Sequence, residues 1–184
     1  MRKWSMEELG RKSVADFKAA PKHPIVVVLD NVRSMHNVGS VFRTADGFLI
    51  EAIYLCGYTP QPPHRDIHKT ALGATETVNW SYAPTTLEAV QELRAAGYKV
   101  WAVEQAQNSV SLEKFTLQWT PEPIAIVMGN EVTGVDAEVM KIVDGCIEIP
   151  QFGSKHSFNI SIATGIVLWE LVKTTIVAKL QQHL

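Results

Sequence analysis

Apolar runs and helical patterns alternate along most of the chain. Four runs are apolar over nearly their whole length, as in strands covered on both faces: PIVVVLD (24–30), AIYLCG (52–57), YKVWAVE (98–104) and EPIAIVMG (122–129). ETVNWSYA (76–83) and GCIEIP (145–150) are shorter strand candidates, and helical patterns cover 37–48, 85–97, 136–143 and 157–181. This alternation predicts an α/β fold, with a mostly parallel sheet and helices on both faces.

The chain before this core has a different character. Ser5 and Glu8 have the spacing of a capping box, which predicts a helix over 6–20 that ends at Pro21. We therefore divide the chain into a basic helical arm, 1–23, and a single domain, 24–184. Within the domain, YTPQPPHRDIHK (58–69) reads as an exposed basic loop, because three prolines precede its charged residues.

Composition restricts the class of protein. The chain is 46% apolar and 20% charged, as in ordinary globular proteins. No apolar stretch approaches the roughly 18 residues of a membrane span, and no signal peptide is evident, so we expect a soluble cytoplasmic protein. Cys56 and Cys146 stand apart from each other and from histidine clusters, which predicts buried free thiols and no metal site.

The net charge of −2 is unevenly distributed. Before Pro24, six Lys and Arg stand against three Asp and Glu, so the arm carries +3 and the rest of the chain −5. A basic arm on an acidic body indicates a polyanionic partner, or simply a solvated helix face. Charge alone leaves both interpretations open.

Three loops at expected strand ends carry the candidate chemistry, since parallel sheets bind ligands at the carboxyl ends of their strands. After the first strand, Asn37, Gly39 and Arg43 have N-x-G-x-x-x-R spacing, and the long Arg43 side chain is expected to reach back toward the strand ends. An ordinary helix cap, a packing glycine and a surface arginine would give the same pattern.

The second loop, VMGNEVTGVD (127–136), places Glu131 between Gly129 and Gly134. It is either a site that a ligand approaches closely or a generic turn with Asp136 as the helix cap. In the third, Pro150 ends a strand, residues 151–156 can fold over a ligand, and Ser157 and Asn159 crowd onto a helix start. Ser157 can be the N-cap, line a pocket, or do both.

Together, NVGSVFRTADG, MGNEVTG and IPQFGSKHSFNISIA resemble, in this order, the three motifs of the SpoU (TrmH-type) RNA ribose methyltransferases of the SPOUT superfamily. The resemblance spans about residues 24–180, and its third motif is the most specific. Gln151 replaces the usual methionine and Phe158 the usual leucine. The resemblance implies a C-terminal trefoil knot, a homodimer, S-adenosylmethionine as cofactor, and methyl transfer to a ribose 2′-hydroxyl of tRNA or rRNA.

The resemblance also assigns residues to roles. Arg43 corresponds to the arginine with catalytic importance, supported by Asn37, Glu131, Ser157 and Asn159. Because arginine keeps its proton in proteins, we expect Arg43 to bind a phosphate and stabilise the developing alkoxide. The expected cofactor residues are Ala102, Val103, Glu104, Gly129, Asn130, Glu131, Gly134, Ile149, Pro150, Ser157 and Phe158. The expected RNA-binding residues are Arg11, Lys12, Arg33, Arg43, His64, Arg65, His68 and Lys69.

Two alternatives share the fold: a SPOUT methyltransferase that acts on a base nitrogen, and a module that binds RNA without catalysis. A nucleotide-binding oxidoreductase is remote, since no G-x-G-x-x-G follows the first strand. The last helix is apolar on almost all sides, which fits a helix that covers both the sheet and a partner subunit, or a plain core helix.

Overall fold

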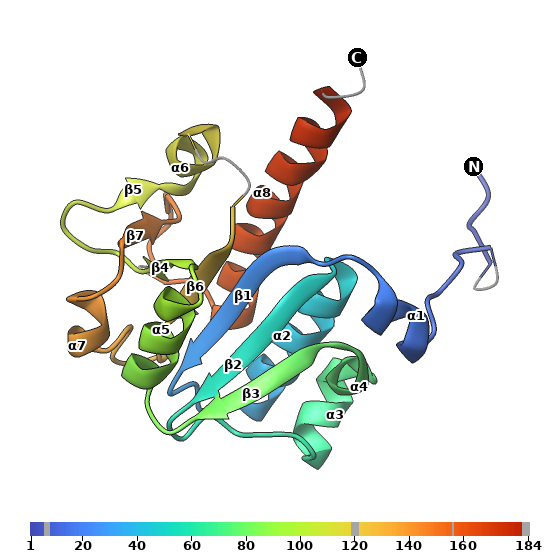
Figure 1. Cartoon of the computed structure of the whole chain (residues 1–184), viewed down its shortest axis with the longest axis horizontal. Helices are drawn as coiled ribbons and strands as arrows, with labels where there is room; N and C mark the ends of the chain where they lie inside the picture. Colours follow the sequence, from blue (N-terminus) through green and yellow to red (C-terminus); the bar gives the residue numbers. More distant parts are fainter. Residues whose placement is uncertain (6–7, 119–121, 156, 182–184) are drawn as a thin grey trace.

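A computed structural model describes residues 1–5, 8–118, 122–155 and 157–181 (Figure 1). Its sheet has seven strands in the order β3-β2-β1-β6-β4-β7-β5, and every neighbouring pair is parallel. The strands are β1 His23–Asp30, β2 Ile50–Cys56, β3 Asn79–Ala83, β4 Lys99–Val103, β5 Val110–Ser111, β6 Ile124–Met128 and β7 Gly145–Glu148. The predicted α/β class with a parallel sheet is confirmed.

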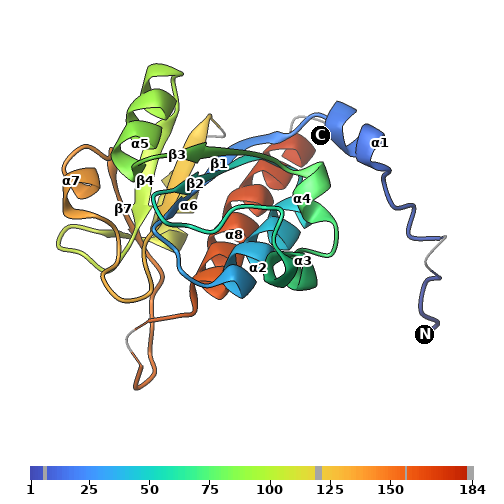
Figure 2. The ribbon, with the colours of Figure 1, turned by 90° about the horizontal axis from the view of Figure 1, so that it is seen from below.

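Helices cover both faces of this sheet, also as predicted. The helices are α1 Val14–Ala19, α2 Met35–Gly47, α3 Arg65–Ala71, α4 Ala74–Thr77, α5 Thr86–Ala95, α6 Leu112–Gln118, α7 Ala137–Met140 and α8 Ile160–Gln181. Figure 2 shows α5 and α7 on one face, with α2, α3, α4 and α8 on the other. Strand β1 serves both cores: Val26 and Val28 pack toward the first face, while Val27 and Leu29 pack toward the second.

The strand order positions the functional site. β1 lies between β2 and β6. Strands β2 and β3 follow on one side of β1 and strands β4 to β7 lie on the other, so the strand order reverses at β1, and such a reversal opens a crevice at the carboxyl ends of the strands. The loops that follow Asp30, Val103, Met128 and Glu148 all meet at this edge. The trefoil knot is not tested by the strand order and stays a prediction.

The N-terminal arm differs from the predicted helix over 6–20. The capping-box hydrogen bonds between Ser5 and Glu8 do form, at 2.6 and 3.2 Å, but the chain makes only a turn there. Gly10 then takes φ +57°, which a continuous right-handed helix does not allow. A second capping box, Ser13 with Asp16, starts the short helix α1, which ends at Ala19. Residues 6–7 lie outside the described part of the chain.

The predicted basic loop 58–69 is wrong in its second half, which forms α3. His64 caps this helix by accepting a hydrogen bond from the Asp66 backbone N–H at Nδ1, 3.1 Å away. Ile67 and Ala71, one helical turn apart, are buried against α2. Arg65, His68 and Lys69 remain exposed on the outer side. The short strand β5, at one edge of the sheet, and the helix α6 that follows it were not predicted.

Other boundaries need smaller corrections. Helix α2 begins at Met35, and Ser34 caps it, rather than Asn37. Cys56 and Cys146 are buried free thiols, as predicted. Over its described length, no helix is both long and apolar enough to cross a bilayer.

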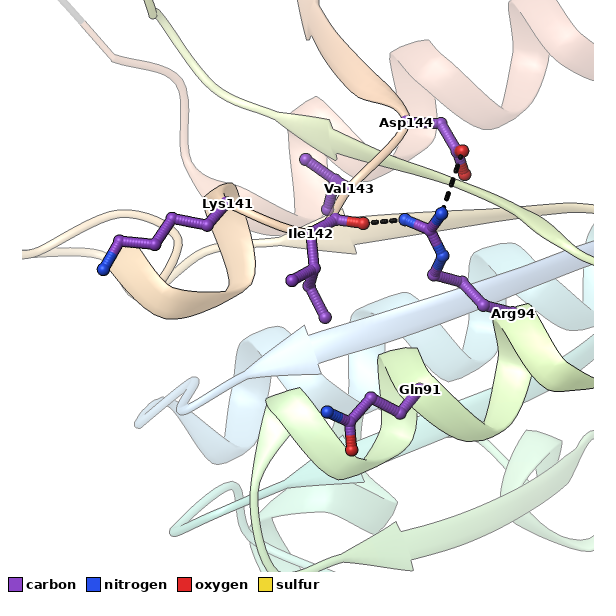
Figure 3. Close-up of a pocket in the computed structure, with 6 residues that line it drawn as sticks. All are labelled: Gln91, Arg94, Lys141, Ile142, Val143 and Asp144. Carbon is purple, nitrogen blue, oxygen red and sulfur yellow. Dashed lines mark hydrogen bonds and ion pairs between the residues drawn. The ribbon is translucent and has the colours of Figure 1, made fainter.

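On the face of α5 and α7, a hollow of about 570 Å³ is organised by Arg94 (Figure 3). Its guanidinium donates to the Ile142 carbonyl and lies 3.5 Å from the Asp144 carboxylate. Asp144 in turn accepts the Val100 N–H of β4, 2.8 Å from its Oδ2. Arg94 therefore ties α5 to the segment that joins α7 to β7.

Replacing Arg94 with alanine is expected to lower the free energy of unfolding by about 1–2 kcal/mol, because a charged hydrogen bond and a partly exposed ion pair are lost. Chemical denaturation measures this change. Lys141→Ala in the same hollow is the control: it removes only an ion pair to Glu138 whose side chains are 66% and 64% exposed. Equal effects of the two substitutions would contradict the role given to Arg94.

Candidate functional site

At the carboxyl ends of β4, β6 and β7, a hollow of about 490 Å³ opens beside the start of α8. Its volume lies in the range of small-molecule sites. Nine of the eleven expected cofactor residues line it: Val103, Glu104, Gly129, Asn130, Glu131, Gly134, Ile149, Ser157 and Phe158. Asn159 lines it as well. The other lining residues are Gln105, Met128, Val132, Gln151, Ile160 and Ala163.

A hydrogen-bonded chain joins one residue from each of the three motifs. The Asn37 Nδ2 donates to Glu131 Oε1 at 3.0 Å, and the Asn159 Nδ2 donates to Asn37 Oδ1 at 3.1 Å. Glu131 Oε2 also accepts the backbone N–H of Arg33 at 3.3 Å. Segments separated by 94 and 122 residues along the chain are thus fixed against one another beside the hollow.

The environment of Glu131 affects its acidity in two opposing ways. Burial raises the pKa, but hydrogen bonds from backbone N–H groups and from the Asn37 amide outweigh it, so the pKa lies below its ordinary value. The carboxylate therefore stabilises the fold at neutral pH, and this contribution is lost as the pH falls through the folded-state pKa.

Asn37→Ala is expected to raise the pKa of Glu131, because it removes one of the donors that favour the charged form. An NMR titration of the Glu131 carboxyl carbon measures the change. Asn79→Ala, at an exposed position of β3, should leave that pKa unaltered. A pKa unchanged in Asn37→Ala would show that this hydrogen bond does not hold the carboxylate.

Asn130 fixes the shape of the turn that carries Glu131. Its Nδ2 donates to the Asn31 carbonyl at 2.6 Å, and its Oδ1 accepts the backbone N–H groups of Val132 and Thr133 at 2.8 and 3.2 Å. Its backbone pairs with Gly134 in both directions at 2.9 Å. Both the side chain and the backbone of Asn130 thus hold the turn in place by hydrogen bonds within the protein.

Asp30, at the end of β1, holds the far end of the same turn. It is 1% exposed, and its carboxylate accepts the backbone N–H of Asp136 at 2.7 Å and the Thr86 hydroxyl at 2.5 Å. Sequence reasoning missed this role. The available signal was a carboxylate directly after a buried apolar strand, where an unpaired charge would be costly.

Glu104 gives the hollow a second carboxylate. Its oxygens accept the backbone N–H groups of Gln105 at 2.9 Å and Val135 at 3.2 Å, which fixes the side chain between β4 and the Gly134 turn. With Glu131, it makes this a site suited to a cationic organic ligand. Within the described ranges, no group of three or more His, Cys, Asp or Glu could hold a metal ion.

Asn159, not Ser157, caps α8. The Asn159 carbonyl accepts the Ala163 N–H, and Asn159 Oδ1 accepts the Ser161 N–H, both at 2.9 Å. The helix begins at Ile160, three residues later than predicted. Ser157 is exposed and lines the hollow. For the loop 127–136, the sequence left open a ligand site or a generic turn capped by Asp136. Asp136 does cap α7, yet Glu131 is held by Asn37 rather than merely solvated.

Three expected site residues lie elsewhere. The Ala102 side chain is fully buried in the core on the α5 face, and Pro150 does not line the hollow. Arg43 is exposed on α2 and does not line the hollow at the carboxyl ends of the strands. It lines a separate hollow of about 640 Å³ together with Arg11 and Lys12 of the arm. Gly39 packs against α3, where an added Cβ would overlap atoms of that helix. This agrees with the interpretation of Gly39 as a packing glycine.

Comparison with protein families decides the identity. The model of the SpoU rRNA methylase family matches residues 24–169, which include all three motifs. The chain belongs to the SpoU rRNA methylase family. The matched segment covers all seven strands except the first residue of β1, together with the first ten residues of α8, so the residues that line the hollow described above lie within it.

Named SpoU-type relatives extend this finding. The 23S rRNA (guanosine-2′-O-)-methyltransferase RlmB of Vibrio parahaemolyticus is 31% identical over 176 residues, which are 94% of this chain and 68% of that protein. The tRNA (guanosine(18)-2′-O)-methyltransferase of Aquifex aeolicus is 30% identical over 147 residues, 79% of this chain and 67% of its own. This chain therefore spans about two thirds of the length of these relatives.

Solved structures of similar proteins have the same fold. The TrmH/SpoU tRNA modifying enzyme of A. aeolicus has a TM-score of 0.76 at 25% identity, with 86% of this chain and 78% of that chain covered. An AdoMet-bound rRNA methyltransferase from Sinorhizobium meliloti has a TM-score of 0.76 at 31% identity, over 85% of this chain and 59% of its own.

Proposed function

We propose that this chain is an RNA methyltransferase that transfers a methyl group from S-adenosylmethionine to a ribose 2′-hydroxyl of tRNA or rRNA. The named relatives are ribose 2′-O-methyltransferases of 23S rRNA and tRNA. The observation that carries the proposal is the Asn37–Glu131–Asn159 chain of hydrogen bonds, which joins the three SpoU motifs at the edge of a pocket of suitable size.

The pocket fits the cofactor chemically. Val103, Met128, Ile149 and Ile160 supply apolar walls for a planar adenine, as small-molecule sites usually do. The carboxylates of Glu104 and Glu131 complement the positive charges of a sulfonium and an ammonium group. Ser157 adds a hydroxyl at the rim. Bound there, S-adenosylmethionine supplies a methyl group that is already activated for transfer.

The chain's own residues must then align the ribose and stabilise its oxygen as the hydroxyl loses its proton. Arg43 is the residue we assign to this task. Its guanidinium stays protonated, so it acts by binding the phosphate beside the target ribose and by stabilising negative charge on the 2′-oxygen. Because Arg43 lines a different hollow from the cofactor residues, the Arg43 that acts beside a given cofactor comes from the second subunit.

RNA would approach over two basic surfaces. One consists of Arg11, Lys12 and Arg43 around the hollow of about 640 Å³ that the arm and α2 line together. The other is the outer side of α3, where Arg65, His68 and Lys69 are exposed and His64 is partly so. Such cations bind the phosphate backbone without regard to sequence.

A homodimer in the cytoplasm, with the cofactor loops in a trefoil knot, completes the proposal. In its support, α8 leaves Ile162, Trp169 and Ile176 exposed at 56, 49 and 44%, at intervals of seven residues on one side of the helix. A helix with buried residues on its other side and large apolar residues outside suits a subunit interface. Analytical ultracentrifugation tests the dimer.

The function is tested by supplying the purified protein with S-adenosylmethionine labelled at its methyl group. The substrate is total tRNA or ribosomal RNA isolated from cells in which the gene for this protein has been deleted. Nucleoside mapping should find the label in 2′-O-methylated nucleosides. Label on a base nitrogen would identify the other SPOUT chemistry. RNA binding without incorporation into either pool would overturn the proposal in favour of a binding module.

A further inference from the structure

Tyr58, in the loop after β2, is an exposed aromatic residue held rigidly in place. It is 57% exposed, yet both of its ends are bound. Its backbone N–H donates to Asn31 Oδ1 at 3.2 Å, and its hydroxyl accepts Asn130 Nδ2 at 3.1 Å. The ring is thus fixed to the same asparagine that shapes the Glu131 turn, while much of its surface faces solvent.

A cation lies against this ring. The Arg33 guanidinium carbon is 5.6 Å from the centroid of Tyr58, within the range of a cation–π contact. Arg33 is exposed, and in the described part of the chain it forms no ion pair. Its backbone N–H donates to Glu131 at 3.3 Å, so the pair is connected to the site through both of its members.

We propose that Arg33 and Tyr58 form a platform on which an unpaired base of the RNA stacks, next to the ribose that is methylated. An aromatic ring and a guanidinium plane are the groups on which proteins stack splayed-out bases, and the free charge of Arg33 complements the adjoining phosphate. Tyr58 is thereby a positioning residue. The inference rests on the proposed function, because it takes the ligand to be RNA.

The platform explains a feature that the cofactor pocket does not need. The Asn130 Nδ2 donates two hydrogen bonds. One, to the Asn31 carbonyl, shapes the turn, and the other goes to the Tyr58 hydroxyl. A rigid ring loses little conformational entropy when a base stacks on it, whereas an unrestrained tyrosine would lose more. Recognition would favour single-stranded segments, because bases in a duplex are already stacked on their neighbours.

The test compares two fluorescein-labelled probes of equal length: a short oligoadenylate, and an abasic ribose-phosphate chain without bases. Fluorescence anisotropy gives the affinity of the full-length protein for each. We expect wild type to bind oligoadenylate more tightly. Tyr58→Leu should weaken oligoadenylate binding about tenfold and leave the abasic probe unchanged, since stacking on one aromatic residue is lost. Arg33→Gln should weaken both probes.

Three further variants sharpen the result. Tyr58→Trp retains a ring and should preserve the preference for oligoadenylate, and Tyr58→Phe separates the ring from its hydroxyl anchor. Tyr82→Leu, at a 46% exposed tyrosine of β3, is the matched control and should behave as wild type. Equal affinity of wild type for the two probes, or equal weakening of both by Tyr58→Leu, would overturn the proposal.

Calorimetry with S-adenosylmethionine separates this inference from the function on which it rests. Unchanged cofactor affinity in Tyr58→Leu, with weaker oligoadenylate binding, supports the platform. If wild type binds the cofactor and methylates RNA but does not distinguish the probes, the platform fails while the proposed function stands. If wild type distinguishes the probes but transfers no methyl group, the proposed function fails, and Tyr58 remains a base-binding residue.

Discussion

Replacing Arg43 with alanine should lower kcat for ribose methylation by about 100- to 1000-fold, the loss found when one preorganised donor to a developing oxyanion is removed. The affinity for S-adenosylmethionine should not change, because Arg43 does not line the hollow in which we place the cofactor. Single-turnover methyl transfer with saturating RNA measures the first quantity and calorimetry the second.

Two comparisons make this expectation sharp. Lys114→Ala removes an exposed cation of α6 that lines none of the three hollows described above, and it should leave kcat unaffected. Arg43→Lys retains the charge but not the planar fork, so near-normal turnover in that variant would argue against bidentate binding of a phosphate. A loss of rate fully explained by weaker RNA binding would remove Arg43 from the chemical step.

The second large effect is expected from Gly129→Ala. A Cβ at position 129 would overlap the backbone of Gly134 and Val135, which cannot move away as a flexible side chain could. The turn would have to open, and its paired hydrogen bonds between Asn130 and Gly134 would be strained. We expect the affinity for S-adenosylmethionine to fall by about 10- to 100-fold, as overpacking of this kind costs about 1–3 kcal/mol.

Gly47→Ala is the control for that substitution, since a Cβ on this last residue of α2 would meet nothing within 4 Å. Calorimetry measures cofactor binding, and thermal unfolding of both variants distinguishes a local effect from a loss of fold. Undiminished binding in a folded Gly129→Ala protein would show that the turn between β6 and α7 does not form the cofactor site.

Strands could be predicted from the sequence because burial on both faces imposes continuous apolar runs, as in residues 24–30. The meeting of the three motifs followed from the rule that parallel strands end at one edge. Neither rule describes segments that depend on tertiary contacts. Helix α3 is stable because Ile67 and Ala71 are buried against α2, and the sequence around them is dominated by proline and charge.

Side-chain roles were harder to predict than positions. The pattern at residues 157–161 fits a cap at either Ser157 or Asn159, and only the folded backbone distinguishes them. Asn130 was assigned to the cofactor from its place in a motif, and the sequence did not reveal that its side-chain amide shapes the turn. The position of Arg43 could not be predicted either, because spacing along a helix does not reveal which hollow its side chain enters.

The separation between Asn37 and Asn159 affects when activity can begin. With 122 residues between hydrogen-bonded partners, a growing polypeptide cannot bring the three SpoU motifs together until the start of α8 has left the ribosome and packed. Incomplete translation products that contain six of the seven strands would therefore be inert toward RNA.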